Sequence, residues 1–543
     1  MLSPRKTLAL STLISAIAAG STFAQSPYVI TKRISTDSLG LEVNGASYRP
    51  SLSLDGRYTA FWSNASNLVP GDVNGYADIF VRDELLGTVE LISVGFGGMG
   101  ADGASTTPTI SPDGRYVAFC TDATNLFSVF DTNGVSDIYI FDRQLGLMSR
   151  ASVDSLGFQA NGPSKEPSFS GDGKFVTFTS DASNLVSGDT NGVQDIFRRA
   201  VTSNQTLCVS TPDSSMGLSA ESNGDSSYSS CSGNGRYIVF ESNATNLVVG
   251  DSNGYRDIFL RDMKDGITER VSVGNSGVQA NLNCFSAAIS RDASKVAFQS
   301  TANSLVSTDL NSYSDIFLCD RSTSTLTLIS TNNDNYPSNG ASYVPSLSGN
   351  GRFIAYQSQS ANLVPGDLNG VTDIFVFDSQ LDYTERVSTN IGLAFGDGGS
   401  YQASISEDGH IVGFSSMATN LIGDDANGVS DIYQYDRLEG GAELLMTPLI
   451  ASQDAILSVT DATPSNVVLV GWSLSGNDQI ATAWGPIHLN PAFLIIPLST
   501  DGAGAASFAF NVPAVLLGFE LSIHGIDIGT DYPTSAYSQE IVL

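Results

Sequence analysis

A tight-turn dipeptide of the type Asp-Gly returns seven times along the 543-residue chain, at steps of 58 to 62 residues. Its copies begin at Asp55, Asp113, Asp172, Asn234, Asp292, Asn350 and Asp408. A second pattern, Asp-x-Asn-Gly-x-x-Asp, keeps the same period and begins at Asp72, Asp131, Asp189, Asp251, Asp309, Asp367 and Asp425. Because two independent markers share one period, we expect the chain to fold as a series of seven equivalent units.

Each repeat holds four short segments of strand-forming residues, separated by turn residues. In the sixth copy these segments are residues 343–347, 353–356, 373–377 and 384–388. Four short strands at a fixed period are typical of a β-propeller, in which each antiparallel blade packs against its neighbours. The 53 glycines and the charged fraction of only 15% agree with many turns and few long helices. The sequence therefore predicts an all-β fold, a seven-bladed β-propeller.

The repeat ends near Thr447, and the chain then changes character. Strand-like runs at 466–472, 492–496, 506–510 and 519–523 alternate with Gly, Pro, Asn and Asp, which is typical of a small β-sandwich. We therefore expect a signal peptide over residues 1–24, the propeller over 25–447 and a C-terminal β-sandwich over 448–543.

The residues before the first copy resemble the last strand of a repeat. Residues 31–36, Thr-Lys-Arg-Ile-Ser-Thr, are similar to residues 269–273, Glu-Arg-Val-Ser-Val. Propellers commonly close when a terminal strand completes the last blade. We therefore expect residues 31–36 to join the blade of the seventh copy, where they displace or supplement residues 443–446.

These repeats carry a resemblance to a known family. Residues 111–119, Ser-Pro-Asp-Gly-Arg-Tyr-Val-Ala-Phe, and residues 137–140, Asp-Ile-Tyr-Ile, resemble the TolB-type, WD-repeat-like propeller repeats of exported bacterial proteins. The resemblance covers about residues 28–447 and implies the propeller fold. It leaves the function open, because such repeats occur in periplasmic assembly proteins, peptidase propeller domains and binding proteins. The chain differs from TolB in having seven copies rather than six and no separate N-terminal domain.

The N-terminus has the pattern of a secretory signal: Arg5 and Lys6, an apolar run over residues 8–19, and small residues up to Ala24. We expect cleavage after Ala24 and a secreted or periplasmic protein. No other stretch is long and apolar enough for a membrane span. The five cysteines are too few for a disulfide scaffold. If one pair forms, we expect Cys208 with Cys231, on adjoining strands of neighbouring repeats.

The chain is strongly acidic, with 56 Asp and Glu against 25 Lys and Arg and a formal net charge of −31. Such a charge repels nucleic acids and anionic lipid headgroups. We therefore expect no nucleic-acid partner and no membrane insertion, and instead a monomer with a protein or glycan ligand.

The Asp-x-Asn-Gly-x-x-Asp loops are the candidate metal sites. Oxygen ligands at positions one, three and seven with a glycine between them resemble the first part of a calcium loop, and two carboxylates per loop imply weak binding of Ca²⁺. The loops should share one face of the propeller and make it anionic. The candidate ligands are Asp72, Asn74, Asp78, Asp131, Asn133, Asp137, Asp189, Asn191, Asp195, Asp251, Asn253, Asp257, Asp367, Asn369, Asp373, Asp425, Asn427 and Asp431. The loop from Asp309 to Asp315 is not among them because Ser312 replaces the glycine.

A structural role explains the same loops. The first Asp then accepts bonds from nearby backbone N–H groups, Asn-Gly reverses the chain, and the last Asp fixes the start of strand three. We expect that last Asp to contact the Ser or Thr that ends strand two, which is Ser63, Thr121, Ser180, Ser242, Ser300, Ser358 or Ser416.

Catalytic patterns are scarce. No nucleophile elbow, P-loop or dinucleotide fingerprint occurs. We expect His410 on a surface strand, and a metal pair of His488 and His524 only if they meet in the tail. The tryptophans Trp62, Trp472 and Trp484 suit packing or a sugar platform. The sequence favours a non-enzymatic binding or scaffold protein. The alternatives are an extracellular polysaccharide-active lyase or hydrolase with its site at the propeller channel, and cell-surface adhesion through the tail.

Overall fold

The computed structural model describes residues 31–437, apart from 129–130, 217–220, 391–393 and 424, together with the backbone of the strands in the C-terminal part. The predicted signal peptide lies outside the described residues. Residues 30–436 form one compact unit, and the described strands that follow belong to another. The expected boundary at residue 447 stays a prediction.

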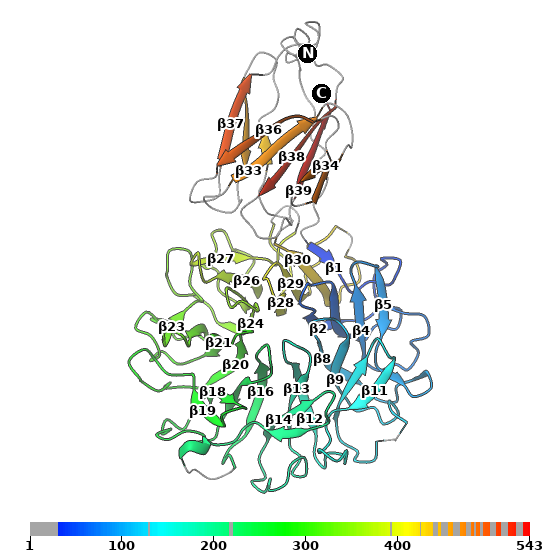
Figure 1. Ribbon diagram of the computed structural model, residues 1–543, viewed down its shortest axis with the longest axis vertical. Helices are drawn as coiled ribbons and strands as arrows, with labels where there is room; N and C mark the ends of the chain where they lie inside the picture. The colour runs from blue at the N-terminus through cyan, green and yellow to red at the C-terminus, as the bar shows by residue number, and fades with distance from the viewer. Residues whose placement is uncertain are drawn as a thin grey trace. The chain divides into compact units, whose positions relative to one another are not determined.

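Seven four-stranded antiparallel sheets form the blades of a β-propeller. The first strand of each blade lies nearest the centre and the fourth lies at the periphery (Figure 1). Blade 1 is β2 (Ser47–Leu52), β3 (Tyr58–Ser63), β4 (Asp78–Asp83) and β5 (Thr88–Leu91). Blade 2 is β8 (Ser105–Ile110), β9 (Tyr116–Thr121), β10 (Asp137–Asp142) and β11 (Leu147–Arg150). Blade 3 is β12 (Ser164–Phe169), β13 (Phe175–Ser180), β14 (Asp195–Ala200) and β15 (Thr206–Cys208).

The remaining blades continue around the ring in chain order. Blade 4 is β16 (Ser226–Cys231), β17 (Tyr237–Ser242), β18 (Asp257–Asp262) and β19 (Ile267–Arg270). Blade 5 is β20 (Cys284–Ile289), β21 (Lys295–Ser300), β22 (Asp315–Asp320) and β23 (Thr325–Leu328). Blade 6 is β24 (Ser342–Leu347), β25 (Phe353–Ser358), β26 (Asp373–Asp378) and β27 (Tyr383–Arg386). Blade 7 is β28 (Ser400–Ile405), β29 (Ile411–Ser416), β30 (Asp431–Asp436) and β1 (Thr31–Arg33).

The two ends of the propeller unit meet in blade 7. β1 pairs with β30 in the antiparallel sense, with Thr31 opposite Tyr435 and Arg33 opposite Tyr433. In Figure 1 the blue β1 lies beside the last blade. The predicted closure is thus confirmed, and residues 31–33 displace residues 443–446 as the fourth strand of blade 7. The segment that the repeat would have used, β31 (Leu444–Met446), pairs instead with β32 (Asp454–Val459).

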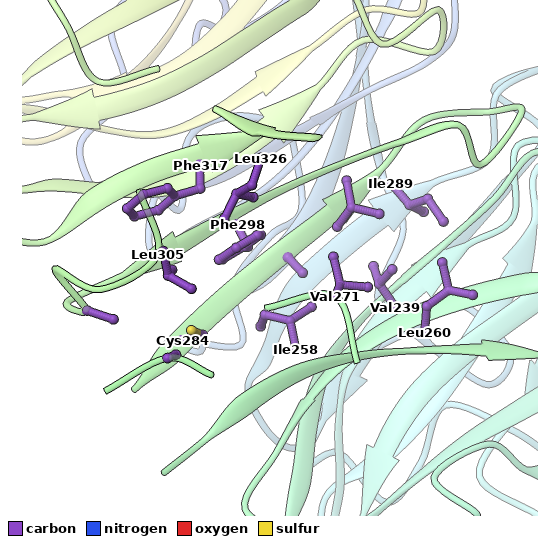
Figure 2. Close-up of a cluster of buried hydrophobic side chains, with 14 of the residues drawn as sticks. Val239, Ile258, Leu260, Val271, Cys284, Ile289, Phe298, Leu305, Phe317 and Leu326 are labelled. Atoms are coloured by element: carbon purple, nitrogen blue, oxygen red, sulfur yellow. The ribbon is translucent and has the colours of Figure 1, made fainter. Parts of the chain in front are cut away.

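The core lies between the blades, where the faces of neighbouring sheets meet. The cluster between blades 4 and 5 contains Val239, Ile258, Phe298 and Phe317, all buried (Figure 2). Within blade 5 the rings of Phe298 and Phe317 stack at 5.7 Å between centroids. Equivalent stacked pairs occur in blades 1, 3, 4, 6 and 7. Because the buried layer repeats with the sequence, the period of the chain is also the period of its core.

A β-bulge interrupts the innermost strand of every blade. The bulge residue has a positive φ although it is never glycine: Arg49, Thr107, Glu166, Tyr228, Ser286, Val344 and Gln402 have φ between 48° and 59°. This conformation is costly for residues with a Cβ and persists where the surroundings fix it. In four of the seven blades a polar side chain accepts the N–H of the bulge residue. Glu241 accepts from Ser286 at 2.8 Å and Gln357 accepts from Gln402 at 2.8 Å.

The turns between first and second strands close one end of the channel with a ring of backbone hydrogen bonds. Leu54 donates to Pro112, Gly233 to Arg291, Arg291 to Gly349, Gly349 to Glu407 and Glu407 to Leu54, at 2.8 to 3.0 Å, and Gly171 donates to Ser232 at 3.3 Å. The junction between blades 2 and 3 lacks this bond because Pro112 has no N–H. The ring surrounds a cavity of about 190 Å³.

Smaller elements complete the described chain. They are a two-stranded sheet of β6 (Val94–Gly95) and β7 (Met99–Gly100) and the 3₁₀ turn η1 (Ser214–Met216). In the C-terminal part β31, β32 and β37 (Ala506–Asn511) form one sheet, and β36 (Ala492–Ser499), β33 (Val467–Ser473), β38 (Glu520–Asp527) and β39 (Ala536–Val542) form another. A further pair consists of β34 (Gln479–Thr482) and β35 (Gly485–His488). The all-β class is confirmed, whereas the packing of these sheets as a sandwich stays a prediction.

The structure bears on the predicted disulfide. All five cysteines are free thiols. The predicted Cys208–Cys231 pair is wrong because Cys208 lies on the outermost strand of blade 3 and Cys231 on the innermost strand of blade 4. Within the described part of the chain, no helix has the length and apolar character needed to cross a membrane.

Candidate functional site

The last Asp of each repeated loop is held by a serine that follows the fourth strand of the same blade. In blade 4 the Ser272 hydroxyl donates to Asp257 Oδ1 at 2.5 Å and also accepts the N–H of Ile258 at 3.0 Å. The same Ser–Asp hydrogen bond occurs in all seven blades, at Ser93–Asp78, Ser152–Asp137, Ser210–Asp195, Ser272–Asp257, Ser330–Asp315, Ser388–Asp373 and Ser35–Asp431. This bond therefore anchors the loop to the periphery of its own blade.

The side-chain amide of the loop asparagine forms hydrogen bonds through both its nitrogen and its oxygen. In blade 4 Asn253 Nδ2 donates to Asp257 Oδ2 at 2.8 Å, while Asn253 Oδ1 accepts the N–H of Tyr255 at 3.1 Å. The loops of blades 1, 2, 3, 6 and 7 have the same two bonds. The amide oxygen that a metal would use is thus already an acceptor for the backbone.

The expected partner of the last Asp is wrong. Ser63 lies opposite Asp78 in the strand register, but its hydroxyl accepts from Ser47 at 2.9 Å and from the N–H of Ala65 at 3.0 Å. The Asp turns the other way, toward Ser93, which follows the fourth strand. Sequence reasoning missed this serine although it recurs 15 residues after the Asp in each of the first six copies.

Four blades contain a buried arginine between the two carboxylates of the loop. In blade 2 Arg150 Nη1 lies 3.4 Å from Asp131 Oδ1 and 3.6 Å from Asp137 Oδ2. Arg270 in blade 4, Arg386 in blade 6 and Arg33 in blade 7 hold the equivalent place, at 2.9 to 3.8 Å from the corresponding oxygens. Each arginine ends its outermost strand opposite the aromatic residue of the third strand. In these blades an internal cation stands where the sequence suggested a metal.

The other three blades have no arginine at that register position. Leu91, Cys208 and Leu328 replace it in blades 1, 3 and 5. Burial and the neighbouring Asp of the same loop raise the pKa of Asp72, Asp189 and Asp309 to about 6. Burial also raises the pKa of the partners Asp78, Asp195 and Asp315. The seven loops thus fall into two electrostatic classes, which differ in whether a guanidinium faces the carboxylates.

The predicted anionic face is weaker than the composition suggested. The last Asp of every loop is buried, and the first is buried or half-buried. The outward position of the loop tip carries Val73, Leu310 and Leu368 in blades 1, 5 and 6, with 83 to 88% of each residue exposed, whereas it is Thr132, Thr190, Ser252 and Ala426 in the other four blades. Tyr76, Tyr255 and Tyr313 are exposed as well. The loop face therefore presents apolar and aromatic tips on loops whose acids point inward.

The channel end near the bulges gathers a second set of polar side chains. Glu241 is buried and accepts from Ser227 at 2.9 Å, from Arg256 at 2.6 Å and from the N–H of Ser286. Its pKa is raised by burial. Tyr228 is partly exposed, and burial together with the nearby Glu166 carboxylate raises its pKa. The acids of this cluster come from different strands, Glu166 from β12 and Glu241 from β17.

The remaining candidate residues occupy structural or separate places. His410 Nδ1 lies 3.1 Å from Asp408 in the turn before β29. Trp62 packs against Tyr48 with ring centroids 4.8 Å apart. His488 and His524 belong to strands of different sheets, β35 and β38. Trp472 lies on β33, and Trp484 lies outside the described residues. Over the described residues, no group of three or more His, Cys, Asp or Glu side chains is arranged to hold a metal.

Comparison with known proteins extends to the fold and no further. No family model and no curated protein matches the chain. A putative TolB from Agrobacterium tumefaciens is 17% identical, with a TM-score of 0.31, over 52% of this chain and 80% of that one. A Mycobacterium tuberculosis puromycin-hydrolyzing peptidase is 10% identical, with a TM-score of 0.43, over 82% of this chain and 62% of that one. The WD40 repeats of RRP9 are 10% identical, with a TM-score of 0.38, over 75% of this chain and 97% of that one. TolB-like and WD40 propellers are thus among the structural neighbours.

Proposed function

We propose that the chain is an exported, non-enzymatic binding or scaffold protein that contacts a protein ligand through the loop face. The observation that carries this proposal is the set of exposed apolar tips, Val73, Leu310 and Leu368, on loops that are fixed internally. Binding residues are commonly found on loops that a rigid scaffold positions.

The rigidity of the loops supports the proposal. Each loop is bonded to the outermost strand of its own blade and to the segment that enters the next blade. In blade 6, for example, Asn369 donates to Asp373 at 2.8 Å and to the carbonyl of Gly396 at 3.1 Å. A tip held in this way loses little conformational freedom on binding, which lowers the entropic cost of association.

The test compares two triple variants of the mature chain, residues 25–543. One carries Val73→Ser, Leu310→Ser and Leu368→Ser on the loop face. The matched control carries Leu85→Ser, Leu145→Ser and Leu381→Ser, which change apolar residues that are 58 to 71% exposed in the turns of the opposite face. Binding to the cell-envelope proteins and to the surface polysaccharides of the producing organism is measured separately for each variant.

We expect the loop-face variant to lose at least tenfold in affinity for a protein ligand, while the control binds like the wild type. Equal binding by both variants contradicts the proposal. If both variants still bind a polysaccharide, the ligand is a glycan and it binds to a surface other than the loop face.

A second candidate is a polysaccharide-active lyase or hydrolase with its site at the channel. The observation that favours it is the pairing of Tyr228 and Glu166 at the bulges, beside the buried Glu241. Burial raises the pKa of Glu241 and of Tyr228, and such groups can serve in general acid–base chemistry. Polysaccharide cleavage that Glu166→Gln abolishes, with unchanged thermal stability, would establish this function, and absence of cleavage by the wild type on the organism's own polysaccharides would remove it.

A further inference from the structure

The guanidinium in blades 2, 4, 6 and 7 always faces the same two atoms. These are Oδ1 of the first Asp and Oδ2 of the last Asp of the loop. In blade 6 Arg386 Nη1 lies 3.3 Å from Asp367 Oδ1 and 3.6 Å from Asp373 Oδ2. The four arginine blades therefore define the place of a positive charge relative to each loop.

Blade 5 has an apolar residue at the register position of the arginine. Leu328 lies opposite Phe317, as Arg386 lies opposite Phe375 in blade 6. The two atoms that would face the guanidinium, Asp309 Oδ1 and Asp315 Oδ2, have no hydrogen-bond partner among the described residues. Asp309 is only 7% exposed and Asp315 is fully buried. Unpartnered buried carboxylate oxygens are costly, so a native fold needs a compensating group.

The loop backbone explains why blade 5 differs from blades 1 and 3. The loop glycine has a φ of +68° to +75° in the six other blades, whereas Ser312 is not among the residues with positive φ. Asn311 donates to the carbonyl of Ser338 at 3.2 Å, as its counterparts donate to the segment that enters the next blade, but Asp315 Oδ2 receives no hydrogen bond of normal geometry from the described residues. In blades 1 and 3 the equivalent Asn74 and Asn191 still donate to the last Asp.

We propose that blade 5 binds a divalent cation of the Ca²⁺ class between Asp309 and Asp315, at the position that the arginine holds in four other blades. Two carboxylates are suitable hard oxygen ligands, and water supplies the remaining coordination of such an ion. The sequence analysis left this loop out of the candidate metal sites because it lacks the glycine. The structure instead shows that it is the loop with two unpartnered carboxylate oxygens among the described residues. It is independent of the proposed function.

The decisive variant is Leu328→Arg, which gives blade 5 the guanidinium of its neighbours. Asp309→Asn is the second variant, since it removes one ligand without changing the volume of the side chain. The matched control is Asp367→Asn in blade 6, where Arg386 already faces the carboxylates. Each protein is the mature chain, treated with EDTA and then titrated with CaCl₂ or MgCl₂, with bound metal and the melting temperature measured.

We expect the wild type and Asp367→Asn to bind one more Ca²⁺ than Leu328→Arg and Asp309→Asn do. At about 10 mM Ca²⁺ the wild type should also gain about 2 to 4 °C in melting temperature beyond the two blade 5 variants. Equal stoichiometry in all four proteins overturns the proposal, as does the absence of binding at that concentration. In that case a proton shared by the two carboxyls compensates the pair.

Discussion

Ser35 and Asp431 lie 396 positions apart in the chain, and the Ser35 hydroxyl donates a 2.5 Å hydrogen bond to Asp431 Oδ1. In the six other blades the equivalent serine follows the Asp in the chain, whereas here it precedes the whole propeller. Ile34 beside it is fully buried and its N–H donates to the carbonyl of Ile432 at 2.7 Å. The same local contact that fixes a loop in every blade therefore also closes the ring.

Removal of the closing strand should open the propeller. A chain that begins at residue 37 lacks β1, so β30 becomes an exposed edge and the buried carboxylate of Asp431 loses both Ser35 and Arg33. We expect a fall in melting temperature of at least about 10 °C, together with self-association through the free edge, since open edge strands pair with other chains. Calorimetry and sedimentation of the truncated chain measure both effects.

The matched control for this truncation is a substitution inside a blade. Ser272→Ala removes the equivalent hydrogen bond without opening the ring, and should cost about 1 to 3 kcal/mol because it leaves a buried acceptor short of a donor. If the truncated chain melts within a few degrees of the wild type and stays monomeric, the closure has no role in stability.

The fold was largely open to prediction because its information is periodic. A loop motif such as Asp251 to Asp257 repeats with its blade, so the number of blades, the strand order and the closing segment all follow from spacing. The partners of the loop were not predictable in the same way. Ser272 and Arg270 approach Asp257 across a strand pair, 15 and 13 residues later in the chain, and only the register brings them together.

The alternation between arginine and an apolar residue at the end of the fourth strand is visible in the sequence, but the sequence alone does not show what this position contacts. The residue two positions before the recurrent serine is Arg in four copies and Leu or Cys in three. An exposed strand end would tolerate either type. Only the buried contact of Arg270 with Asp251, at 2.9 Å, shows that this position decides the charge of the loop.

The opposite face should depend on pH through a repeated arginine clamp. Arg236 donates to both oxygens of Asp262, at 2.5 to 3.1 Å. Burial alone would raise the pKa of Asp262, but Arg236 and two backbone N–H groups outweigh it and hold the pKa at about 2. Since this lies below the value of an unfolded Asp, about 3.9, the stabilisation is complete above pH 4 and disappears as the pH falls toward 2.

The variant Arg236→Gln isolates that effect. At pH 7 we expect it to be only slightly less stable than the wild type, because the pair is partly exposed and screened by solvent. The difference should shrink toward zero near pH 2. Urea unfolding of both proteins at several pH values measures it, and a difference that stays constant with pH would mean that the arginine acts through packing rather than charge.

The ring at the closed end of the channel predicts an order of sensitivity among its glycines. A Cβ on Gly233 would lie 2.7 Å from the carbonyl oxygen of Arg291, which the backbone ring holds in place. A Cβ on Gly349 would meet only the carboxyl group of Glu407, the flexible end of a side chain. We expect Gly233→Ala to cost about 1 to 3 kcal/mol, as overpacking does, and Gly349→Ala clearly less. If thermal unfolding shows equal losses of stability for both variants, the backbone ring shifts as a whole to accommodate either Cβ.

The buried arginines should be more important for stability than the exposed ones, although both types face aspartates. Arg386 is 4% exposed at its side chain, contacts Asp367 and Asp373, and stacks over Phe395 at 3.6 Å from the ring centroid. Arg386→Leu leaves two buried carboxylates without a positive charge, which should cost about 3 to 5 kcal/mol.

Arg352→Leu is the matched control for that substitution, because Arg352 pairs with Asp378 at 2.6 Å but is 32% exposed. It should cost about 1 kcal/mol, as partly exposed pairs do. Arg386→Leu also makes blade 6 like blade 1, where a leucine takes the place of the arginine and the loop asparagine still donates to the last Asp. Added Ca²⁺ should therefore leave the stability of both variants unchanged. Denaturant unfolding with and without calcium tests this, and a gain in stability of Arg386→Leu with calcium would show that the vacated guanidinium position binds a cation even where the asparagine donates.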